Sequence, residues 1–230
     1  MHFGYSNEIR SDYPELASGA LFARGIARDA QVDARLAKYY ATAEARLATH
    51  LEGELPEIQA WRRVFSRMGL KSTQYRCASE QLLRRFRKEK SLPRIHPLID
   101  LCNAVSLAFA IPVAVFDIAK IADDLEVRYA AGDEAYLTFS GETEHPEAHE
   151  VIFADDAGSA HARRWTNRQS GLSAVRNETE AVLIVAEAMH DSGPEDVSRL
   201  IAAIADELRA VWSVTPKSER LDRRSSRFEF

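Results

Sequence analysis

The pattern of apolar and polar positions divides the chain into a helical first part and a strand-rich second part. Apolar residues recur at helical spacing over residues 30–51 and 58–68, and residues 19–26 have the length and content of a strand. Short apolar runs separated by glycine and aspartate then predict strands at 125–130, 136–139, 151–154, 160–165 and 182–185. A last helical stripe runs from 197 to about 212, after a capping box over 192–195. This order predicts an α+β fold rather than a doubly wound sheet.

Residues 75–117 hold two predicted helices and a strand, punctuated by prolines. The first helix begins near Ser79, has a basic exposed face, and ends before Pro93. Pro97 can open the second helix, which is apolar enough to be buried although it carries Asp100, Asn103 and Ser106. A buried strand is expected over 113–116. The polar residues of the buried helix need hydrogen-bond partners.

Several runs of sequence carry a resemblance to a known family. They are SEQLLRR, LPRIHPLIDLCNAVSL, IPVAVFDIAKI, RRWTNRQS and NETEAVLIVAEAM, in that order, within residues 15–190. Together they resemble the B3/B4 domain of the phenylalanyl-tRNA synthetase beta chain, and more closely the free-standing bacterial proteins built from that domain. The resemblance implies a single B3/B4-type α+β domain over 1–214, with a β-sandwich-like core flanked by helices. Residues 215–230 are polar and charged, and we expect them to form a disordered tail.

The resemblance also implies a pocket that receives a mischarged amino acid while water cleaves its ester bond to tRNA. The resemblance places Cys102, Asn103 and Ala114 at the pocket. Three more candidate substrate-binding residues are Arg168, Gln169 and Ser170, because their side chains can bind a substrate and a similar Arg-Gln-Ser run marks the free-standing relatives. The chain departs from the synthetase pattern at three of its positions. A threonine of the synthetase is Cys102 here, its histidine is Ala114, and its editing glutamate falls near Val185, with Glu187 two residues further on. The catalytic residues are therefore unassigned from sequence, and Cys102 is more simply explained as a small core residue.

Composition limits how the chain can contact RNA. Its net charge of −5 gives no global attraction to nucleic acid, so phosphate contacts require a local basic face. The candidate RNA-binding residues lie on the basic helix and at the end of the strand after residue 160: Arg84, Arg85, Arg87, Lys88, Arg163, Arg164 and Trp165. Arginines can clamp phosphates and Trp165 can stack on a base. The same arginines can instead pair with neighbouring acids, and Trp165 can instead lie in the core.

The function implied by the resemblance is binding of the aminoacyl end of tRNA, with hydrolysis of a mischarged aminoacyl-tRNA as an open question. Two alternatives remain: a non-catalytic module that binds a free amino acid or aminoacyl ester, and a protein-interaction domain that docks through the helices at 30–68. No cofactor is expected.

Metal, membrane and DNA partners are not expected either. The two cysteines have no CxxC spacing, and His145 and His149 fall in an acidic, proline-containing loop rather than on a helix. No segment approaches the ~20 apolar residues of a membrane span, and the first ten residues lack the apolar core of a secretion signal. We therefore expect a cytoplasmic protein.

Overall fold

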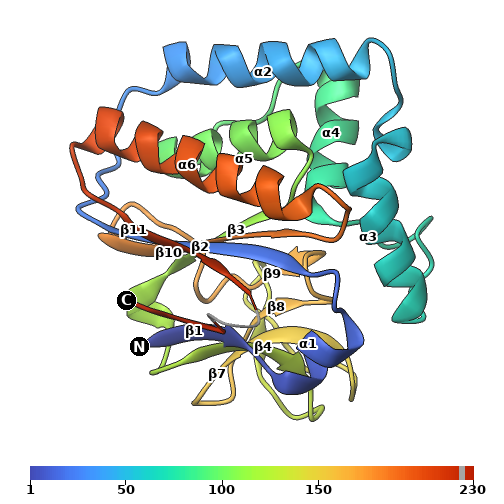
Figure 1. Cartoon of the computed structure of the whole chain (residues 1–230). Coiled ribbons are helices and arrows are strands. Elements are labelled where there is room, and N and C mark those ends of the chain that lie inside the picture. Colours follow the sequence, from blue (N-terminus) through green and yellow to red (C-terminus); the bar gives the residue numbers. More distant parts are fainter. Residues whose placement is uncertain (223–225) are drawn as a thin grey trace.

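The computed structural model describes residues 1–222 and 226–230, which form two stacked β-sheets with a layer of helices on the outer face of one of them (Figure 1). The four-stranded sheet has the order β11-β2-β10-β3, and all its neighbours are antiparallel. Its strands are β2 (Ala17–Arg24), β3 (Val113–Asp117), β10 (Ala181–Ala188) and β11 (Lys217–Leu221). It is the middle layer, so its central strands β2 and β10 are buried on both faces and are mainly apolar, whereas the edge strand β11 is polar and exposed except at Leu221.

The second sheet has six strands in the order β12-β1-β4-β7-β8-β9, and only the β1–β4 pair is parallel. Its strands are β1 (His2–Tyr5), β4 (Leu125–Tyr129), β7 (Val151–Asp155), β8 (Ala160–Arg163), β9 (Arg168–Gln169) and β12 (Arg227–Glu229). A separate hairpin of β5 (Tyr136–Leu137) and β6 (Thr143–Glu144) extends from it.

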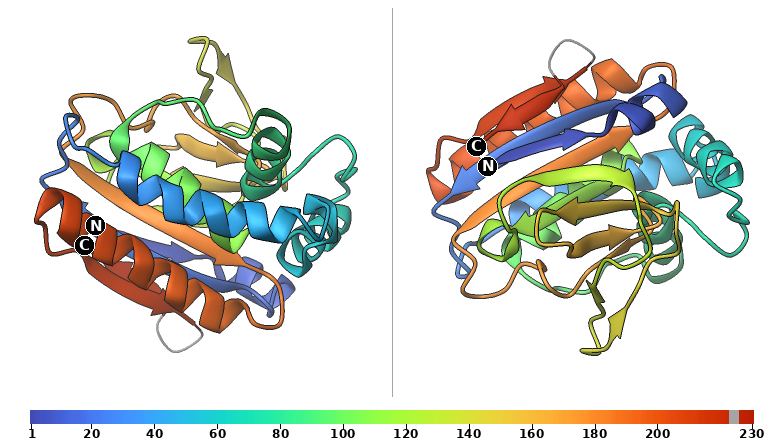
Figure 2. Two further views of the ribbon diagram at one scale, coloured as in Figure 1. Left: turned by 90° about the horizontal axis from the view of Figure 1, so that it is seen from above. Right: turned by 90° about the horizontal axis from the view of Figure 1, so that it is seen from below.

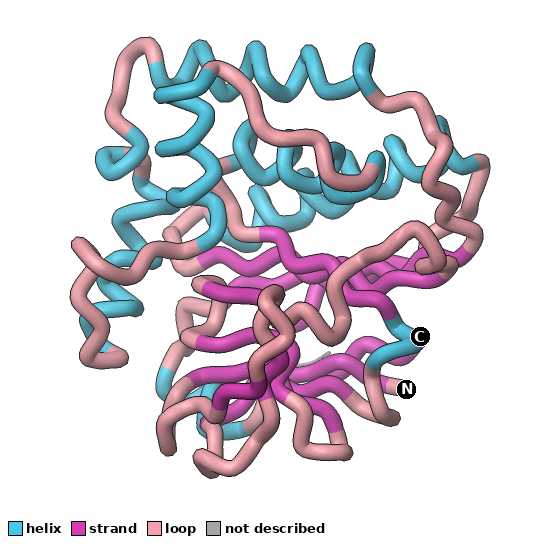
Figure 3. Tube along the Cα trace, turned by 180° about the vertical axis from the view of Figure 1, so that it is seen from behind, coloured by secondary structure: helices cyan, strands magenta, loops and turns pink. Residues whose placement is uncertain are grey.

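The long helices gather on one side of the molecule and the strands on the other (Figure 3). Their bounds are α2 (Asp33–Leu47), α3 (Pro56–Arg67), α4 (Ala78–Glu89), α5 (Pro97–Phe109) and α6 (Gly193–Trp212). Shorter helices are α1 (Asn7–Asp12), η1 (Glu52–Glu54) and η2 (Ile118–Lys120). Helices α5 and α6 lie side by side over the four-stranded sheet, and α2 crosses above α5 (Figure 2).

Gly19 explains how closely α6 approaches β2. A Cβ at this position would lie 2.6 Å from Ile201 and 2.9 Å from Val197, both on α6. A larger residue would therefore push the helix away from the sheet.

Two polar residues of the buried helix α5 have the hydrogen-bond partners that their burial requires. Asp100 accepts hydrogen bonds from the backbone N–H of Ile95 and from Arg94, and Ser106 donates to the carbonyl of Ile111 at 2.6 Å. The Nδ1 of His96 caps the helix by accepting from the N–H of Leu98. These contacts fix the start of α5 and the turn that leads into β3.

Successive side chains of β10 point to opposite faces of the four-stranded sheet and so enter two different apolar cores, one under the helices and one between the sheets. Val182, Ile184 and Ala186 face the helices, whereas Leu183 and Val185 face the second sheet. Glu187 has the same parity as Val185, so its carboxylate points into the apolar space between the sheets.

The predicted α+β class and the sandwich of two sheets with flanking helices are confirmed. The prediction of a disordered tail is wrong for residues 217–221 and 227–229, because these residues form β11 and β12, with Leu221 and Phe228 buried. Both strands find an open sheet edge, β2 and β1 respectively, which the composition of the tail does not reveal. Residues 223–225, also part of that expectation, lie outside the described residues. Two other details differ: Cys77 rather than Ser79 is the N-cap of α4, and Ser192 makes no side-chain capping bond.

Candidate functional site

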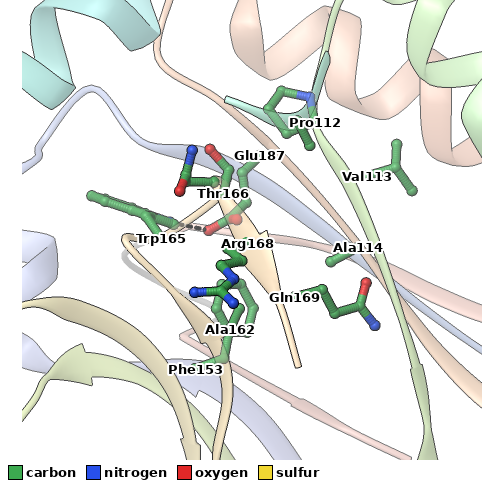
Figure 4. A pocket seen from close by; sticks show the side chains of 12 residues that line it. Pro112, Val113, Ala114, Phe153, Ala162, Trp165, Thr166, Arg168, Gln169 and Glu187 are labelled. Carbon is green, nitrogen blue, oxygen red and sulfur yellow. Dashed lines mark hydrogen bonds between the residues drawn. The ribbon is translucent and has the colours of Figure 1, made fainter. Parts of the chain in front are cut away.

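A cavity of about 60 Å³ lies between the two sheets, where β3 begins and β10 ends. One wall comes from Pro112, Val113 and Ala114, and the opposite wall from Phe153 and Ala162 of the second sheet (Figure 4). Its polar contributions come from Glu187, from Thr166 and Asn167 in the turn after β8, and from Arg168 and Gln169 of β9. A water molecule needs about 10–15 Å³ of such space, so the cavity has room for a few waters or a small side chain.

Glu187 is the buried carboxylate of this cavity, with 2% of its surface exposed. Its Oε1 accepts a hydrogen bond from the Tyr5 hydroxyl at 2.8 Å and another from the Trp165 indole N–H at 2.7 Å. Oε2 accepts no hydrogen bond from residues 1–222 or 226–230. Burial raises the pKa of Glu187 to about 7, against the opposing effect of its two donors. The carboxyl group is therefore poised to change charge near neutral pH.

Trp165 is held in the core by the turn after β8. Arg164 and Trp165 both have positive φ, 48° and 57°, which turns the indole inward. The ring packs edge-on against Tyr13 and Trp61, with centroids 4.8 and 5.3 Å away, and is 0% exposed. The prediction that Trp165 stacks on an RNA base is therefore wrong for this conformation. The alternative that places it in the core is the one observed.

The segment 167–169 is tied to its surroundings by hydrogen bonds. Gln169 donates to the carbonyl of Val115 at 2.7 Å, and Asn167 donates to the carbonyl of Arg76 at 2.8 Å. Arg168 pairs with Glu144 at 3.0 Å while its side chain remains 42% exposed. This segment gives the cavity a fixed amide wall and one exposed cation at its rim.

Only half of the predicted substrate residues line the cavity. Ala114, Arg168 and Gln169 do so. Cys102 and Asn103 lie on α5, which covers the opposite face of the four-stranded sheet, and burial raises the pKa of the Cys102 thiol to about 12. Ser170 is buried and donates to the carbonyl of Leu137. The sheet therefore separates Cys102 and Asn103 from this cavity.

The predicted RNA-binding residues are dispersed. Arg84 and Arg87 both pair with Glu52, which is itself buried, and Arg85 pairs with Glu89. Lys88 is exposed on the same helix.

Two arginines after residue 160 behave differently from each other. Arg163 is only 4% exposed and lies between Glu144 and Glu150, so the prediction that it contacts phosphate is wrong for this conformation. Arg164 is half-buried, with its guanidinium 4.9 Å from the Tyr75 ring centroid.

A second buried polar network has the residue types of a hydrolytic triad without its geometry. His161 contacts Ser173 through Nδ1 at 2.8 Å and Asp155 through Nε2 at 3.1 Å, whereas a serine nucleophile normally faces Nε2. His161 and Ser173 are fully buried. Asp155 also accepts from three backbone N–H groups, and these bonds, with the one from His161, hold its pKa at about 2 despite burial. The network joins β7 and β8 to the loop after β9, which is a structural role.

No cluster of three or more histidine, cysteine, aspartate or glutamate side chains suited to a metal occurs in the part of the chain that the structure describes. No helix within these residues has the length and apolar character needed to cross a membrane.

Comparison with known families gives the decisive match. The model of the B3/4 domain matches residues 60–203, which include every cavity-lining residue from Ala78 to Glu187. The chain belongs to the B3/4 domain family. This confirms the resemblance drawn from the ordered sequence runs.

Curated relatives of this B3/4 chain are beta subunits of phenylalanine–tRNA ligase. The one from Pasteurella multocida (strain Pm70) is 26% identical over 166 residues, which are 70% of this chain and 20% of that protein. The one from Mannheimia succiniciproducens is 32% identical over 93 residues, 40% of this chain and 11% of that protein. The chain thus spans a fifth or less of these relatives.

A solved structure shows the same fold. It is an N-terminal fragment of the phenylalanyl-tRNA synthetase beta subunit from Pyrococcus horikoshii, similar with a TM-score of 0.51 at 9% identity. The match covers 96% of this chain and 54% of that one.

Sequence reasoning underrated two residues of the B3/4 cavity. Glu187 is the only charged residue in β10, and an isolated acid in a strand buried on both faces is a signal that could have found it. Thr166 lines the cavity with a buried hydroxyl that has no hydrogen-bond partner in the described structure. No sequence signal marks Thr166, because its position depends on the turn at Arg164 and Trp165.

Proposed function

We propose that this B3/4 chain binds the aminoacyl end of a tRNA in the cavity between its sheets and hydrolyses the ester that joins the amino acid to the ribose. The observation that carries the proposal is the cavity itself, where an apolar wall faces a buried carboxylate that has one oxygen free. The curated relatives support it, because they are ligases that act on tRNA by name.

The cavity offers what ester hydrolysis requires of a protein. The apolar surfaces of Pro112, Val113 and Ala114 can receive a side chain of limited size. The unpartnered Thr166 hydroxyl is a donor for the ester carbonyl, and donors placed where negative charge develops lower the barrier. The remaining space can hold the attacking water beside the bound ester.

The tRNA backbone would be held by cations around the cavity rather than by the net charge of the chain. Arg168 lies at the rim and Arg164 is in the same surface segment. On α4, Lys88 and Arg85 remain candidates for more distant phosphates. Such contacts weaken with salt, by a log–log slope of about 0.7–0.9 per phosphate. We further propose a cytoplasmic location, where aminoacyl-tRNAs are used.

The direct test is deacylation. The full chain is incubated in catalytic amounts with a panel of aminoacyl-tRNAs, matched and mismatched, and release of the amino acid is followed against a protein-free control. We expect turnover on one or a few mismatched pairs with small side chains. Absence of turnover on the whole panel would refute hydrolysis.

A matched pair of variants then locates the reaction. Ala114→Leu fills the cavity and should lower kcat/KM by about 10- to 100-fold, as expected for an added steric mismatch in an apolar pocket. Cys102→Ala, on the far side of the four-stranded sheet, should leave it unchanged. If Cys102→Ala were the damaging change, the substrate pocket would lie on the helical side.

A further inference from the structure

The carboxylate of Glu187 is held in one orientation through Oε1, which leaves Oε2 without a hydrogen bond from the described residues. Tyr5 from β1 and Trp165 from the turn after β8 both donate to Oε1, so the group cannot rotate without breaking two hydrogen bonds. Oε2 has no partner among the described residues, and the side chain lines the cavity. Oε2 is not among the fully buried polar atoms that lack a partner, so it is accessible from the cavity and a water molecule or a substrate atom can lie beside it.

We propose that Glu187 is the general base of the ester hydrolysis, with Oε2 accepting the proton of the attacking water. The inference rests on the proposed function and assigns a catalytic residue within the same cavity. It supplies the base that could not be found at the positions where the sequence departs from the synthetase.

The step balances without a cofactor. The water oxygen forms a bond to the ester carbonyl carbon while one water proton moves to Oε2 of Glu187. The tetrahedral intermediate then collapses, the bond from carbon to the ribose oxygen breaks, and the proton held by Glu187 passes to that ribose oxygen. The products are the free amino acid and a tRNA with its terminal hydroxyl restored, and the carboxylate is regenerated.

The surroundings of Glu187 suit a base that works near neutral pH. The groups facing it are the Tyr5 hydroxyl, the Trp165 indole, and Ser18, which lies opposite it on β2. Arg168 is the charged side chain that shares the cavity lining, and Arg10 lies over the Tyr5 ring, with its Cζ 5.0 Å from the ring centroid. Burial raises the pKa of Glu187 to about 7, close to the value at which a general base is most effective.

The test is a pH–rate profile of single-turnover deacylation, from pH 5.5 to 9, with the protein-free rate subtracted. For the wild-type chain we expect the rate to fall tenfold per pH unit below about 7 and to level off above it. Glu187→Gln should lower the plateau by about 100- to 10,000-fold and abolish the acid limb. It should leave binding of a non-hydrolysable, amide-linked aminoacyl-tRNA unchanged.

Tyr5→Phe provides a second variant whose effect a purely structural role would not produce. Losing one donor to Oε1 disfavours the carboxylate, so the acid limb should move to higher pH. Tyr5 is a positioning residue in this scheme. Thermal melts of Tyr5→Phe and Glu187→Gln serve as the control that tests whether both variants are folded.

The outcomes separate this inference from the proposed function. A wild-type chain that is inactive on every aminoacyl-tRNA overturns both. An active wild-type chain whose Glu187→Gln variant keeps the same plateau and acid limb overturns the role of Glu187 alone. If Glu187→Gln is unfolded, an unshifted acid limb in Tyr5→Phe overturns it instead.

Discussion

Replacing Glu187 by glutamine should make the protein more stable at neutral and alkaline pH. In the folded state burial raises the pKa of Glu187 to about 7, whereas the pKa in the unfolded chain is near the usual glutamate value of 4.5. The folded state therefore holds a proton between these values that the unfolded state releases. Stability from this group is fully present below pH 4.5 and is lost as the pH rises through about 7. Glutamine keeps the shape and has no charge to bury.

The size of the effect follows from the difference between the two pKa values. Each pKa unit corresponds to about 1.4 kcal/mol, so the difference amounts to about 3 kcal/mol in the free energy of unfolding. Only 2% of the Glu187 surface is exposed, so solvent screens this value little. For a chain of this length the change corresponds to roughly 6–12 °C in Tm.

Urea unfolding of both proteins at intervals from pH 4.5 to 8.5 measures the effect. The quantity to plot is the difference in unfolding free energy between Glu187→Gln and the wild type, because all other titrating groups cancel. We expect this difference to grow by about 3 kcal/mol in favour of the variant between pH 4.5 and 8. Unchanged m-values would show that both proteins unfold from the same folded state.

Glu207→Gln is the matched control. Glu207 is also buried, but it accepts hydrogen bonds from Arg35 and Tyr39 and pairs with Lys38, and its pKa is lowered despite burial because of these partners. Its replacement should destabilise the protein by about 1.5–3 kcal/mol at pH 7. If Glu187→Gln behaved like this control, or its advantage did not vary with pH, the carboxyl of Glu187 would not titrate as the structure implies.

Two further predictions concern the helical layer. His96 can accept the backbone N–H of Leu98 only when its ring is neutral, and burial lowers its pKa. The free energy of unfolding of the wild type should therefore fall, relative to that of His96→Asn, as the pH drops below about 6.5. In urea titrations at pH 8 the two proteins should agree within about 1 kcal/mol. The double change Arg84→Glu and Arg87→Glu should lower the free energy of unfolding by about 3–5 kcal/mol, because buried Glu52 would then face two like charges. Lys88→Glu should change the free energy of unfolding by under about 0.5 kcal/mol. It is therefore the better variant for testing salt-dependent tRNA binding.

Much of the fold could be predicted because its signals are local. Pro97 marks the start of α5, and the Ile111-Pro112 pair follows shortly after its end. The sequence of β10 is so apolar that it predicts a buried strand. The elements that were missed depend on distant partners. Strand β1 has only four residues, and its pairing with β4 joins positions over a hundred residues apart. Composition cannot reveal such a partner.

The site was predicted less well, because a cavity depends on which face of an element each residue takes. Asn103 lies on a helix that packs on one face of the four-stranded sheet, whereas Ala114 faces the other, although they are eleven residues apart. Trp165 looked accessible among its polar neighbours, and only the two left-handed backbone conformations at 164–165 bury it. Glu187 was noticed as a neighbour of Val185, but its two donors come from distant parts of the chain.

The placement of β2 has a consequence for synthesis on the ribosome. Both of its partners, β10 and β11, begin at residue 181 or later, more than 150 residues after β2 ends. At about 5–20 residues per second, the apolar segment around Leu21 is made roughly 10–30 s before a partner strand exists. During that interval it is an unpaired apolar strand that a chaperone could bind. We expect a chain stalled before residue 181 to aggregate or be held by chaperones, since its central sheet cannot begin to form.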